Sequence, residues 1–431
     1  MSRQLEWLKE EVARWRADGL VDAALAQRIL ARYPPAAERN WGRVIFSAIG
    51  AVLVGLGVIL FFAYNWQDLP KAAKLALVIG ALVLAHGGAI GVARRPDASR
   101  GLVEGLHVLG TMLFGAGIWL VAQIYHIDEH YPNAFLVWSA GALTMAWAMP
   151  SIAQALLALF LVSFWAGVEL FDFHTPVHGA PLLVVLGVLP LAWWRRSPAL
   201  LFCTLAVLLL LTALAAGAVH AKAVLPLLYL MGAAALVAGA AAPGSAFPAA
   251  RGPLRAVGTL VVIGSSYLLS FKDLDGLLRK VDFSRPEIAI YLAAAGAALA
   301  GAVAMLARGW PTAPPDRYGR WQLGLAAAGL AIVLPGMFLL ARGGGWPVVI
   351  SFNVIVLGFA ALLILEGSER LRPRMVGAGC LLFAMVAIGR YADLFTSLLV
   401  RAAVFVALGA ALFLVGNFYA RSRRRAQGAQ P

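Results

Sequence analysis

The sequence predicts an all-α, polytopic helical integral membrane protein with about 14 transmembrane helices, in a range of 12–14, and a small N-terminal cytoplasmic helical hairpin. Of the 431 residues, 61% are hydrophobic and only 13% are charged, and the mean hydropathy is +0.82. A soluble domain has about 25% charged residues and about 45–50% apolar ones. Apolar runs of about 20 residues, the length of a membrane-crossing helix, recur along the chain. The short alternating segments of a transmembrane β-barrel are absent from the sequence.

The net charge of +14 does not indicate nucleic-acid binding. The Arg and Lys residues lie in short segments between the apolar runs, which is the pattern of orientation signals in membrane proteins. Cys203 and Cys380 each lie inside an apolar run, so we expect small buried side chains rather than a disulfide framework. We therefore expect the lipid bilayer as a partner, no nucleic acid and no cofactor.

Residues 1–40 are predicted to form two short amphipathic helices on the cytoplasmic side. Gly19 suits the left-handed position that ends the first helix, and Asp22 is the expected N-cap of the second. Their apolar stripes are Leu5, Leu8, Val12 and Trp15, and Leu25, Ile29 and Leu30. So small a pair buries little core, and we expect it to dock on the membrane domain, on headgroups, on a second copy or on a protein partner. It contains no apolar signal-peptide region, so the first membrane helix is the expected insertion signal.

The transmembrane domain is predicted to span 41–420, followed by a basic cytoplasmic tail at 421–431. Two runs, 134–149 and 180–194, are shorter than a perpendicular helix needs, and the second contains Pro190. The apolar runs are 43–64, 71–93, 101–122, 134–149, 151–171, 180–194, 198–218, 223–241, 254–271, 287–307, 321–341, 346–366, 374–390 and 397–418.

Loop charges predict that both termini are cytoplasmic. The expected location, a bacterial inner membrane, is what the family resemblance given below implies. The loops expected outside at 123–133 and 172–179 contain no Lys or Arg, whereas 272–286 contains four and is interpreted as an interfacial helix. The loops expected inside carry Arg94, Arg95, Arg100, Arg195, Arg196, Arg251, Arg255, Arg308, Arg317, Arg320, Arg370, Arg372 and Arg374.

A duplicated helical hairpin is predicted within 43–149. The pattern Gly50-x4-Gly55-x-Gly57 recurs as Gly110-x4-Gly115-x-Gly117, and Gly80-Ala81-Leu82 recurs as Gly141-Ala142-Leu143. Parallel repeats of this kind occur in transporters. The alternative is that the small residues simply allow close packing of helices.

Several stretches resemble the bacterial predicted-membrane-protein family catalogued as domain of unknown function 2157. They are Asp18-Gly19-Leu20, Asn65-Trp66 with Pro70 and Lys74, Gln123-Ile124-Tyr125-His126 with Phe135-Leu136 and Trp138, and Arg390-Tyr391-Ala392-Asp393-Leu394-Phe395 with Arg401. The resemblance covers about 170 N-terminal and about 60 C-terminal residues. It implies a membrane architecture and marks these residues, but it implies no activity.

Ionisable side chains inside the predicted helices are the first functional candidates, because their burial in a bilayer is costly. His86, Glu104 and His107 are expected at similar depth, and Glu104 and His107 share one helical face. This trio could relay protons, ligate a metal or form a structural hydrogen-bonded cluster. Asn353 and Glu366 are further isolated polar groups in a later helix.

The loops expected outside hold a second group of candidates. His126 and His130, like His174 and His178, are four residues apart, and two such pairs near carboxylates could bind a divalent ion. The alternative is a polar loop with aromatic anchors at the membrane interface. The other candidates on this side are Asn65, Trp66, Lys74, Gln123, Tyr125, Asp128, Glu169, Arg390, Asp393 and Arg401.

The sequence lacks a GxxxxGK[ST] phosphate loop, a Cys-pair metal motif, HExxH and Gly-x-Ser-x-Gly. The leading hypothesis is a transporter or permease of a small solute or ion. It rests on the predicted spans, the orientation, the duplicated hairpin and the sparse ionisable residues inside the spans. The alternatives are a non-catalytic envelope assembly or sensing subunit, and a membrane-embedded enzyme of envelope lipid or glycan chemistry.

Overall fold

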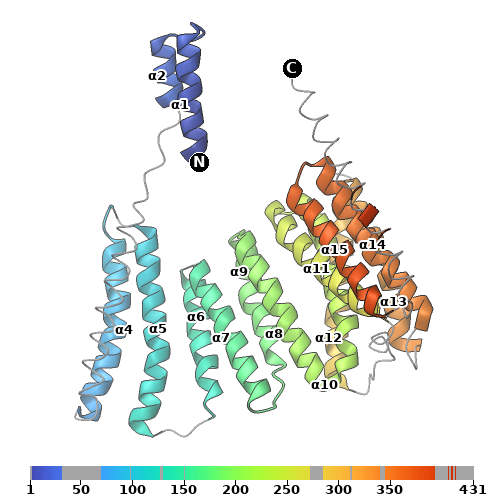
Figure 1. The fold of residues 1–431 in the computed structure, drawn as a ribbon. Coiled ribbons are helices and arrows are strands. Elements are labelled where there is room, and N and C mark those ends of the chain that lie inside the picture. The colour runs from blue at the N-terminus through green and yellow to red at the C-terminus, as the bar shows by residue number, and fades with distance from the viewer. Residues whose placement is uncertain are drawn as a thin grey trace. The chain divides into compact units, whose positions relative to one another are not determined.

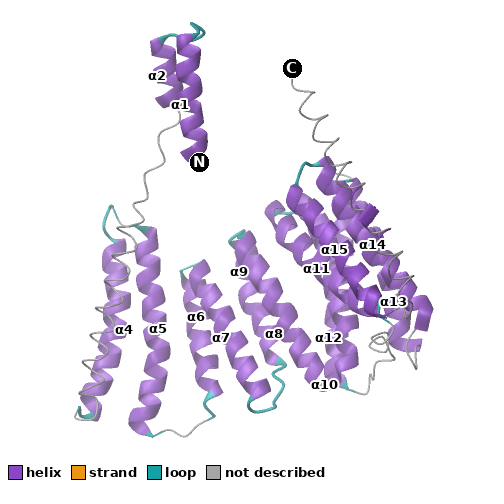
Figure 2. Cartoon of the chain, in the orientation of Figure 1, coloured by secondary structure: helices purple, strands orange, loops and turns teal. Residues whose placement is uncertain are grey.

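The computed structural model describes residues 2–31, 69–97, 99–126, 130–149, 151–271, 285–310, 313–339 and 345–393, with a few isolated positions beyond. The chain divides into two compact units, 1–76 and 77–431. No strand occurs in these described ranges (Figure 2), which confirms the all-α prediction. The predicted runs 43–64 and, apart from isolated positions, 397–418 lie outside them, as do Asn65, Trp66, Asp128 and Arg401.

The N-terminal segment forms α1 (Ser2–Ala17) and α2 (Ala23–Ala31). Gly19 has a φ of +69°, as a left-handed helix end requires, and the backbone N–H of Leu25 donates to Asp22 Oδ1 at 2.6 Å. Both local predictions are confirmed. Val12 and Ala26 are buried, whereas Leu25 of the expected apolar stripe is 43% exposed. The pair therefore keeps apolar surface exposed after its two helices have packed.

Antiparallel helices make up the rest of the described chain (Figure 1). They are α4 (Lys71–Ala93), α5 (Arg100–Tyr125), α6 (Pro132–Ala148), α7 (Ile152–Phe171), α8 (Gly179–Leu183), α9 (Leu189–Trp194), α10 (Pro198–Ala241), α11 (Arg251–Leu269), α12 (Pro286–Gly309), α13 (Arg317–Leu339), α14 (Gly345–Glu369) and α15 (Pro373–Asp393). We call the end that holds the connections 94–99, 149–151, 195–197, 242–250, 310–316 and 370–372 the arginine-rich end.

Eight helices in the described part of the chain are long and apolar enough to cross a membrane, by length and composition. Shorter apolar helices lie at Gly179–Trp194 and Pro373–Gly389. Their bounds agree closely with the predicted apolar runs, so a polytopic membrane protein is confirmed. The total of about 14 helices stays a prediction, because two of the predicted runs lie outside the described ranges.

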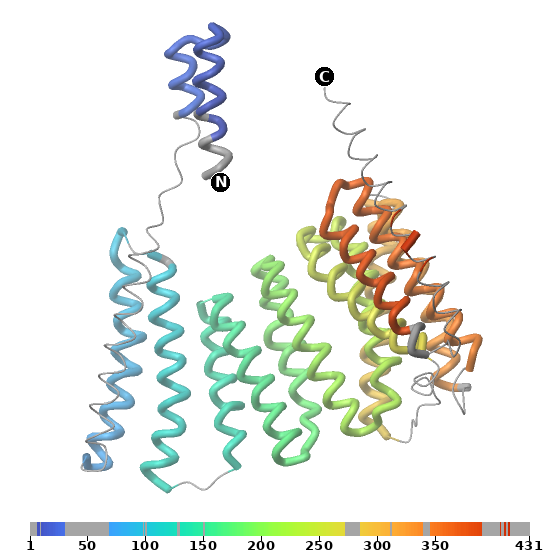
Figure 3. Tube along the Cα trace, in the orientation of Figure 1, coloured from blue at the N-terminus to red at the C-terminus, as the bar shows by residue number. Residues whose placement is uncertain are grey.

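Helix α10 is a hairpin rather than one straight helix. Its 44 residues are interrupted at His220, whose backbone angles (φ −158°, ψ 95°) are not helical. Leu200 and Leu201 belong to the same buried cluster as Ala242, although a straight helix would separate them by about 60 Å at ~1.5 Å per residue. The chain therefore reverses at His220, as the two predicted runs 198–218 and 223–241 require (Figure 3).

The short predicted run around Pro190 contains a π-helical turn at Val184–Val188, between α8 and α9. Proline lacks the N–H that an α-helix would use at this position, and its ring clashes with the preceding turn. A wider turn is one way to accommodate this. The indole N–H of Trp147 donates to the carbonyl of Gly187 at 2.8 Å, so a carbonyl of the wider turn has a partner from α6.

Two glycines of the predicted repeat let side chains of neighbouring helices approach α5. A Cβ atom at Gly110 would collide with the ring of His86, and one at Gly115 would collide with the ring of Trp138. Close packing is thus sufficient to explain these glycines. The proposed first copy, which begins at Gly50, lies outside the described residues, so the duplication stays a prediction.

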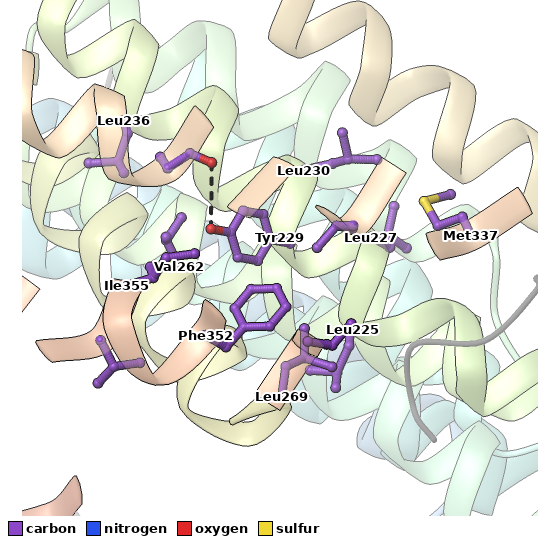
Figure 4. Close-up of a cluster of buried hydrophobic side chains, with 14 of the residues drawn as sticks. Leu225, Leu227, Tyr229, Leu230, Leu236, Val262, Leu269, Met337, Phe352 and Ile355 are labelled. Carbon is purple, nitrogen blue, oxygen red and sulfur yellow. Dashed lines mark hydrogen bonds between the residues drawn. The ribbon is translucent and has the colours of Figure 1, made fainter. Parts of the chain in front are cut away.

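The largest buried cluster joins α10, α11, α12, α13, α14 and α15 (Figure 4). Tyr229 is fully buried there, packs edge-on against Phe352 with ring centroids 6.2 Å apart, and donates to the carbonyl of Ala326 at 3.5 Å. Gly329 leaves room for the Tyr229 hydroxyl, which a Cβ atom would displace. This packing sets the positions of the helices that carry the site described below.

We expect Gly258→Ala to lower the thermal stability of the detergent-solubilised protein. A Cβ at Gly258 of α11 would lie 2.7 Å from the backbone N of Leu236 and 2.8 Å from the carbonyl O of Gly232, so α10 and α11 must move apart. Overpacking of this kind costs about 1–3 kcal/mol. Thermal unfolding followed by tryptophan fluorescence measures the effect. Gly264→Ala, where nothing lies within 4 Å of the added atom, is the control, and an equal loss there would contradict the prediction.

Candidate functional site

Two groups of polar side chains lie within the unit 77–431, both near the arginine-rich end. The histidine cluster consists of His86, Glu104, His107, Thr111, Ser151 and Gln154. The arginine cluster consists of Arg251, Arg255, Asp316, Gln322, Glu366 and Arg370. Only Glu366 of the arginine cluster was singled out by the sequence patterns as a functional candidate.

The histidine cluster brings together two of the three predicted side chains. Nδ1 of His86 lies 3.0 Å from Nδ1 of His107, a distance at which one ring donates its proton to the other. Glu104 instead accepts from Ser151 Oγ at 2.5 Å. A pocket of about 530 Å³ is lined by Glu104, His107 and Ser151, together with Arg95 and Arg195. The arrangement can hold a proton between the two imidazoles.

The same cluster also has a structural role in holding α5, α6 and α7 together. Gln154 Nε2 donates to Thr111 Oγ1 at 2.9 Å, and the indole N–H of Trp138 donates to the carbonyl of Thr111 at 2.8 Å. Thr111 and Gln154 are buried. These bonds join three helices at one level.

The arginine cluster is centred on Glu366, whose side chain is fully buried. Its Oε2 accepts from an N–H of Arg255 at 2.5 Å, and its Oε1 lies 3.3 Å from Nε of Arg370. Arg255 also donates through Nε to Gln322 Oε1 at 2.7 Å. Asp316 pairs with both Arg370 and Arg251, the latter at 3.2 Å. The network thereby joins α11, α13, α14 and the two connections beside them.

The helix ends explain why these residues meet. Arg255 is in the second turn of α11, Gln322 is in the second turn of α13, and Glu366 is in the last turn of α14. All three positions are within about 8 Å of a helix end at ~1.5 Å per residue, so these polar groups lie near the ends of apolar helices. A buried carboxylate at this level needs paired donors, and two arginines provide them.

Asp316 is held in its charged form. Partial burial alone would raise its pKa, but the backbone N–H of Gly319 and the nearby Arg251 and Arg370 outweigh burial and lower the pKa below its ordinary value. Gly319 donates to Asp316 Oδ1 at 3.0 Å. Asp316 therefore stays negative at neutral pH and neutralises part of the surrounding positive charge.

A cavity of about 980 Å³ adjoins the arginine cluster. It is lined by Arg251, Arg255, Glu366 and Arg370 at one end and by apolar side chains of α11, α14 and α15 elsewhere. One buried oxygen atom in its lining, Thr259 Oγ1, has no hydrogen-bond partner within the described structure, and Glu366 Oε1 has only the 3.3 Å ion-pair contact with Arg370 Nε. Buried polar atoms with unused hydrogen-bonding capacity beside a cavity of ligand size make this cavity the candidate ligand site.

The opposite end holds separate polar pairs rather than one cluster. His130 Nε2 lies 2.9 Å from Glu169 Oε1, which also accepts from the indole N–H of Trp165 at 3.3 Å. Tyr131 donates to Asp172 Oδ2 at 2.9 Å, and this bond raises the pKa of Tyr131. These contacts connect the start of α6 to the end of α7.

The four histidines of the metal hypothesis do not gather in the described structure. His126 follows the end of α5 and is exposed, so it does not share a helix face with His130. His178 lies 2.8 Å from the Tyr291 hydroxyl of α12, and His174 has a φ of +54° in a loop. No group of three His, Cys, Asp or Glu suited to a metal occurs among the described residues. The metal site stays an untested prediction.

The remaining candidates lie apart from these clusters. Gln123 and Tyr125 are exposed in the last turn of α5. Asn353 Nδ2 donates to the carbonyls of Val349 at 2.7 Å and Ser270 at 3.2 Å, which ties α14 to the end of α11. The other placements are Lys74 in the first turn of α4, and Arg390 and Asp393 in the last turn of α15.

The sequence patterns missed most of the arginine cluster. Arg251, Arg255 and Arg370 were interpreted as orientation signals, because they lie at the ends of apolar runs. One signal of this cluster was present in the sequence. Arg255 lies inside the predicted run 254–271, four residues after Arg251. An arginine inside such a run needs an acidic partner, and Glu366 was the isolated carboxylate at the same expected depth.

Replacement of Glu366 by Gln should strongly destabilise the protein. Arg255 and Arg370 would then be left without their buried carboxylate partner, and breaking such a buried pair costs about 3–5 kcal/mol. Chemical unfolding in detergent measures the change. Glu369→Gln, three residues later, removes one partner of the exposed Arg317–Glu369 pair and should have a much smaller effect. Similar losses of unfolding free energy in both variants would show that the burial of Glu366 makes no contribution to stability.

The contribution of Asp316 should depend on pH. Because its pKa in the folded protein is below the ordinary value of 3.8, its charge stabilises the fold above pH ~4, and this stabilisation is lost as the pH falls through the folded pKa. Asp316→Asn should therefore melt at a lower temperature than the wild type at pH 7, with the difference shrinking below pH ~4. Melting curves between pH 7 and pH 3 test this, and a constant difference would contradict it.

Comparison with known proteins gives one match. Residues 13–155 match the family described as "Predicted membrane protein (DUF2157)". No curated protein and no solved structure matches the chain. The matched segment contains the histidine cluster and ends before the arginine cluster. The resemblance carried by Asp18-Gly19-Leu20 and Gln123–His126 is thereby confirmed: the N-terminal third of this chain is similar to a predicted membrane protein family.

Proposed function

We propose that this protein is a transporter or permease whose ligand is an anion, and that the ligand binds in the cavity beside the arginine cluster. One observation carries the proposal: a fully buried Glu366, paired with Arg255, lines a cavity of about 980 Å³ inside an apolar helical domain. Charged side chains inside membrane domains are costly, and they commonly mark substrate pathways.

The ligand is expected to be negative because the cavity has an excess of positive charge. Arg251, Arg255, Arg370 and Arg372 line it, and the carboxylates that pair with this group are Glu366 and Asp316. Four cations against two anions leave a net charge of +2. Arginine recognises phosphate and carboxylate groups through its planar fork of donors.

The arginine-rich end is proposed to face the cytoplasm of a bacterial cell, with both termini inside. The positive-inside rule supports this orientation, since the arginines of short connections gather at that end. The anion would then bind from the cytoplasmic side, and the opposite end, with His130 and Glu169, would face outward.

Flux measurements test the proposal. The purified protein is reconstituted into liposomes, and exchange of radiolabelled phosphate, exchange of glycerol 3-phosphate and movement of a fluorescent phosphatidylglycerol between leaflets are measured. We expect flux of at least one probe above that of empty liposomes. The double variant Arg255→Gln, Glu366→Gln should reduce it at least tenfold, because it removes the buried charged pair from the cavity. Arg370, which also contacts Glu366, keeps its second partner, Asp316.

The exposed pair supplies the control for this measurement. Arg317→Gln, Glu369→Gln removes a charged pair that is 59% and 50% exposed and does not line the cavity, so its flux should equal that of the wild type. The absence of flux for all three probes, or full flux in the Arg255, Glu366 double variant, would overturn the proposal.

A further inference from the structure

We infer that the anion bound by this cavity is a phospholipid, with its phosphate among the arginines and one acyl chain in the groove between α11 and α15. The inference rests on the proposed function in taking the arginine-lined cavity as the ligand site. It adds the chemical class of the ligand and the direction of entry, from the side of the helical domain rather than from its end.

The headgroup end has donors and acceptors that the protein itself leaves unused. Arg372 lines the cavity and has no carboxylate partner among the described residues. Thr259 Oγ1 is buried without a hydrogen-bond partner there, and Glu366 Oε1 has only the 3.3 Å contact with Arg370 Nε. A phosphodiester supplies acceptors for Arg372, and a headgroup hydroxyl or amine supplies a donor for Glu366 Oε1.

The rest of the cavity is an apolar groove. Its lining includes Leu363 of α14, Leu260 and Ile263 of α11, and Leu382 and Met385 of α15. The Tyr267 hydroxyl donates to the carbonyl of Met385 at 3.0 Å, so these two lining residues join α11 to α15. The groove is therefore charged near Arg255 and Glu366 and apolar along the rest of its lining.

The length of the groove matches one leaflet of a bilayer. Arg255 and Tyr267, at its two ends, are separated by about 18 Å along α11 at ~1.5 Å per residue. Half of a hydrocarbon core of ~30 Å is about 15 Å. A soluble anion would use only the arginine end, whereas an acyl chain of ordinary length would fill the groove and bury its apolar walls.

Exposure of the walls indicates entry from the side. Leu260 is 73% exposed and Met385 is 43% exposed. On the same face of α11, four or eight residues from Leu260, Gly252, Ala256 and Gly264 are exposed and line the cavity. These small residues leave the opening wide on the surface that would face lipid. The positive charge at one end then selects a lipid with an anionic headgroup.

Lipid binding to the full-length protein tests the inference. Native mass spectrometry of detergent-purified protein is used to compare phosphatidylglycerol with phosphatidylcholine of the same acyl chains. We expect one phosphatidylglycerol bound in preference to phosphatidylcholine, and no displacement by excess inorganic phosphate or glycerol 3-phosphate. Displacement by either soluble ion would identify a free phosphate site and overturn the lipid assignment.

Two variants separate the headgroup from the acyl chain. Arg372→Gln should weaken phosphatidylglycerol binding about fivefold, the effect of one arginine near an anionic lipid. Leu260→Trp should abolish it by filling the groove. Both residues are exposed, so both variants should fold. The matched controls are Arg374→Gln and Leu381→Trp, which alter exposed residues of α15 outside the cavity lining and should bind as the wild type does.

The remaining outcomes separate the inference from the proposed function. Unchanged binding in Leu260→Trp would overturn the inference. A crosslink between cysteines introduced at position 260 and in the segment 397–418 would also overturn it, because that segment would then occupy the groove in place of lipid. Phosphatidylglycerol binding without flux of any probe would support the inference and refute transport. Phosphate exchange without lipid binding would support transport and refute the inference.

Discussion

The carboxylate of Glu366 sets the strongest physical constraint on the C-terminal half of this protein. A fully buried negative charge is stable only if donors surround it, and Arg255 and Arg370 must therefore stay within reach. This requirement holds α11 beside α14. It also holds the connection 370–372, which precedes α15, close to both helices. Gln322 extends the constraint to α13. The cavity exists because these helices meet through long charged side chains at one end.

The two halves of the helical domain use different polar groups to hold their helices together. Near the arginine-rich end, α5 is joined to α7 by Gln154 on Thr111 and to α4 by His107 on His86, and Glu104 of α5 accepts from the neutral Ser151. In the C-terminal half, ion pairs between carboxylates and arginines join the helices. Four arginines line the cavity there, against two in the pocket beside Glu104. An excess of arginine attracts anions, so the ligand site is expected in the C-terminal half.

Most of the fold could be predicted from the sequence, because apolar length and breaks between runs follow directly from the bilayer thickness. The hairpin at His220 and the caps at Gly19 and Asp22 depend on local residues and were predicted correctly. The arginine cluster depends on contacts between helices distant in sequence, which periodicity does not contain. In the sequence, Arg255 has the position of an orientation signal. Its pairing with Glu366 follows only from the packing of α14 beside α11. The metal hypothesis assumed helical spacing at His126, where α5 has already ended.

The sequence separation of the central ion pair has a consequence for biogenesis. Arg255 precedes Glu366 by 111 residues, which corresponds to roughly 6–20 seconds of synthesis at ~5–20 residues per second. During this interval α11 has to enter the bilayer with an arginine that has no acidic partner. Its position in the second turn allows the guanidinium to reach the headgroups in the meantime. The location of Arg255 near the end of α11 therefore allows this helix to enter the bilayer before α14 has been made, and the ion pair with Glu366 can form afterwards.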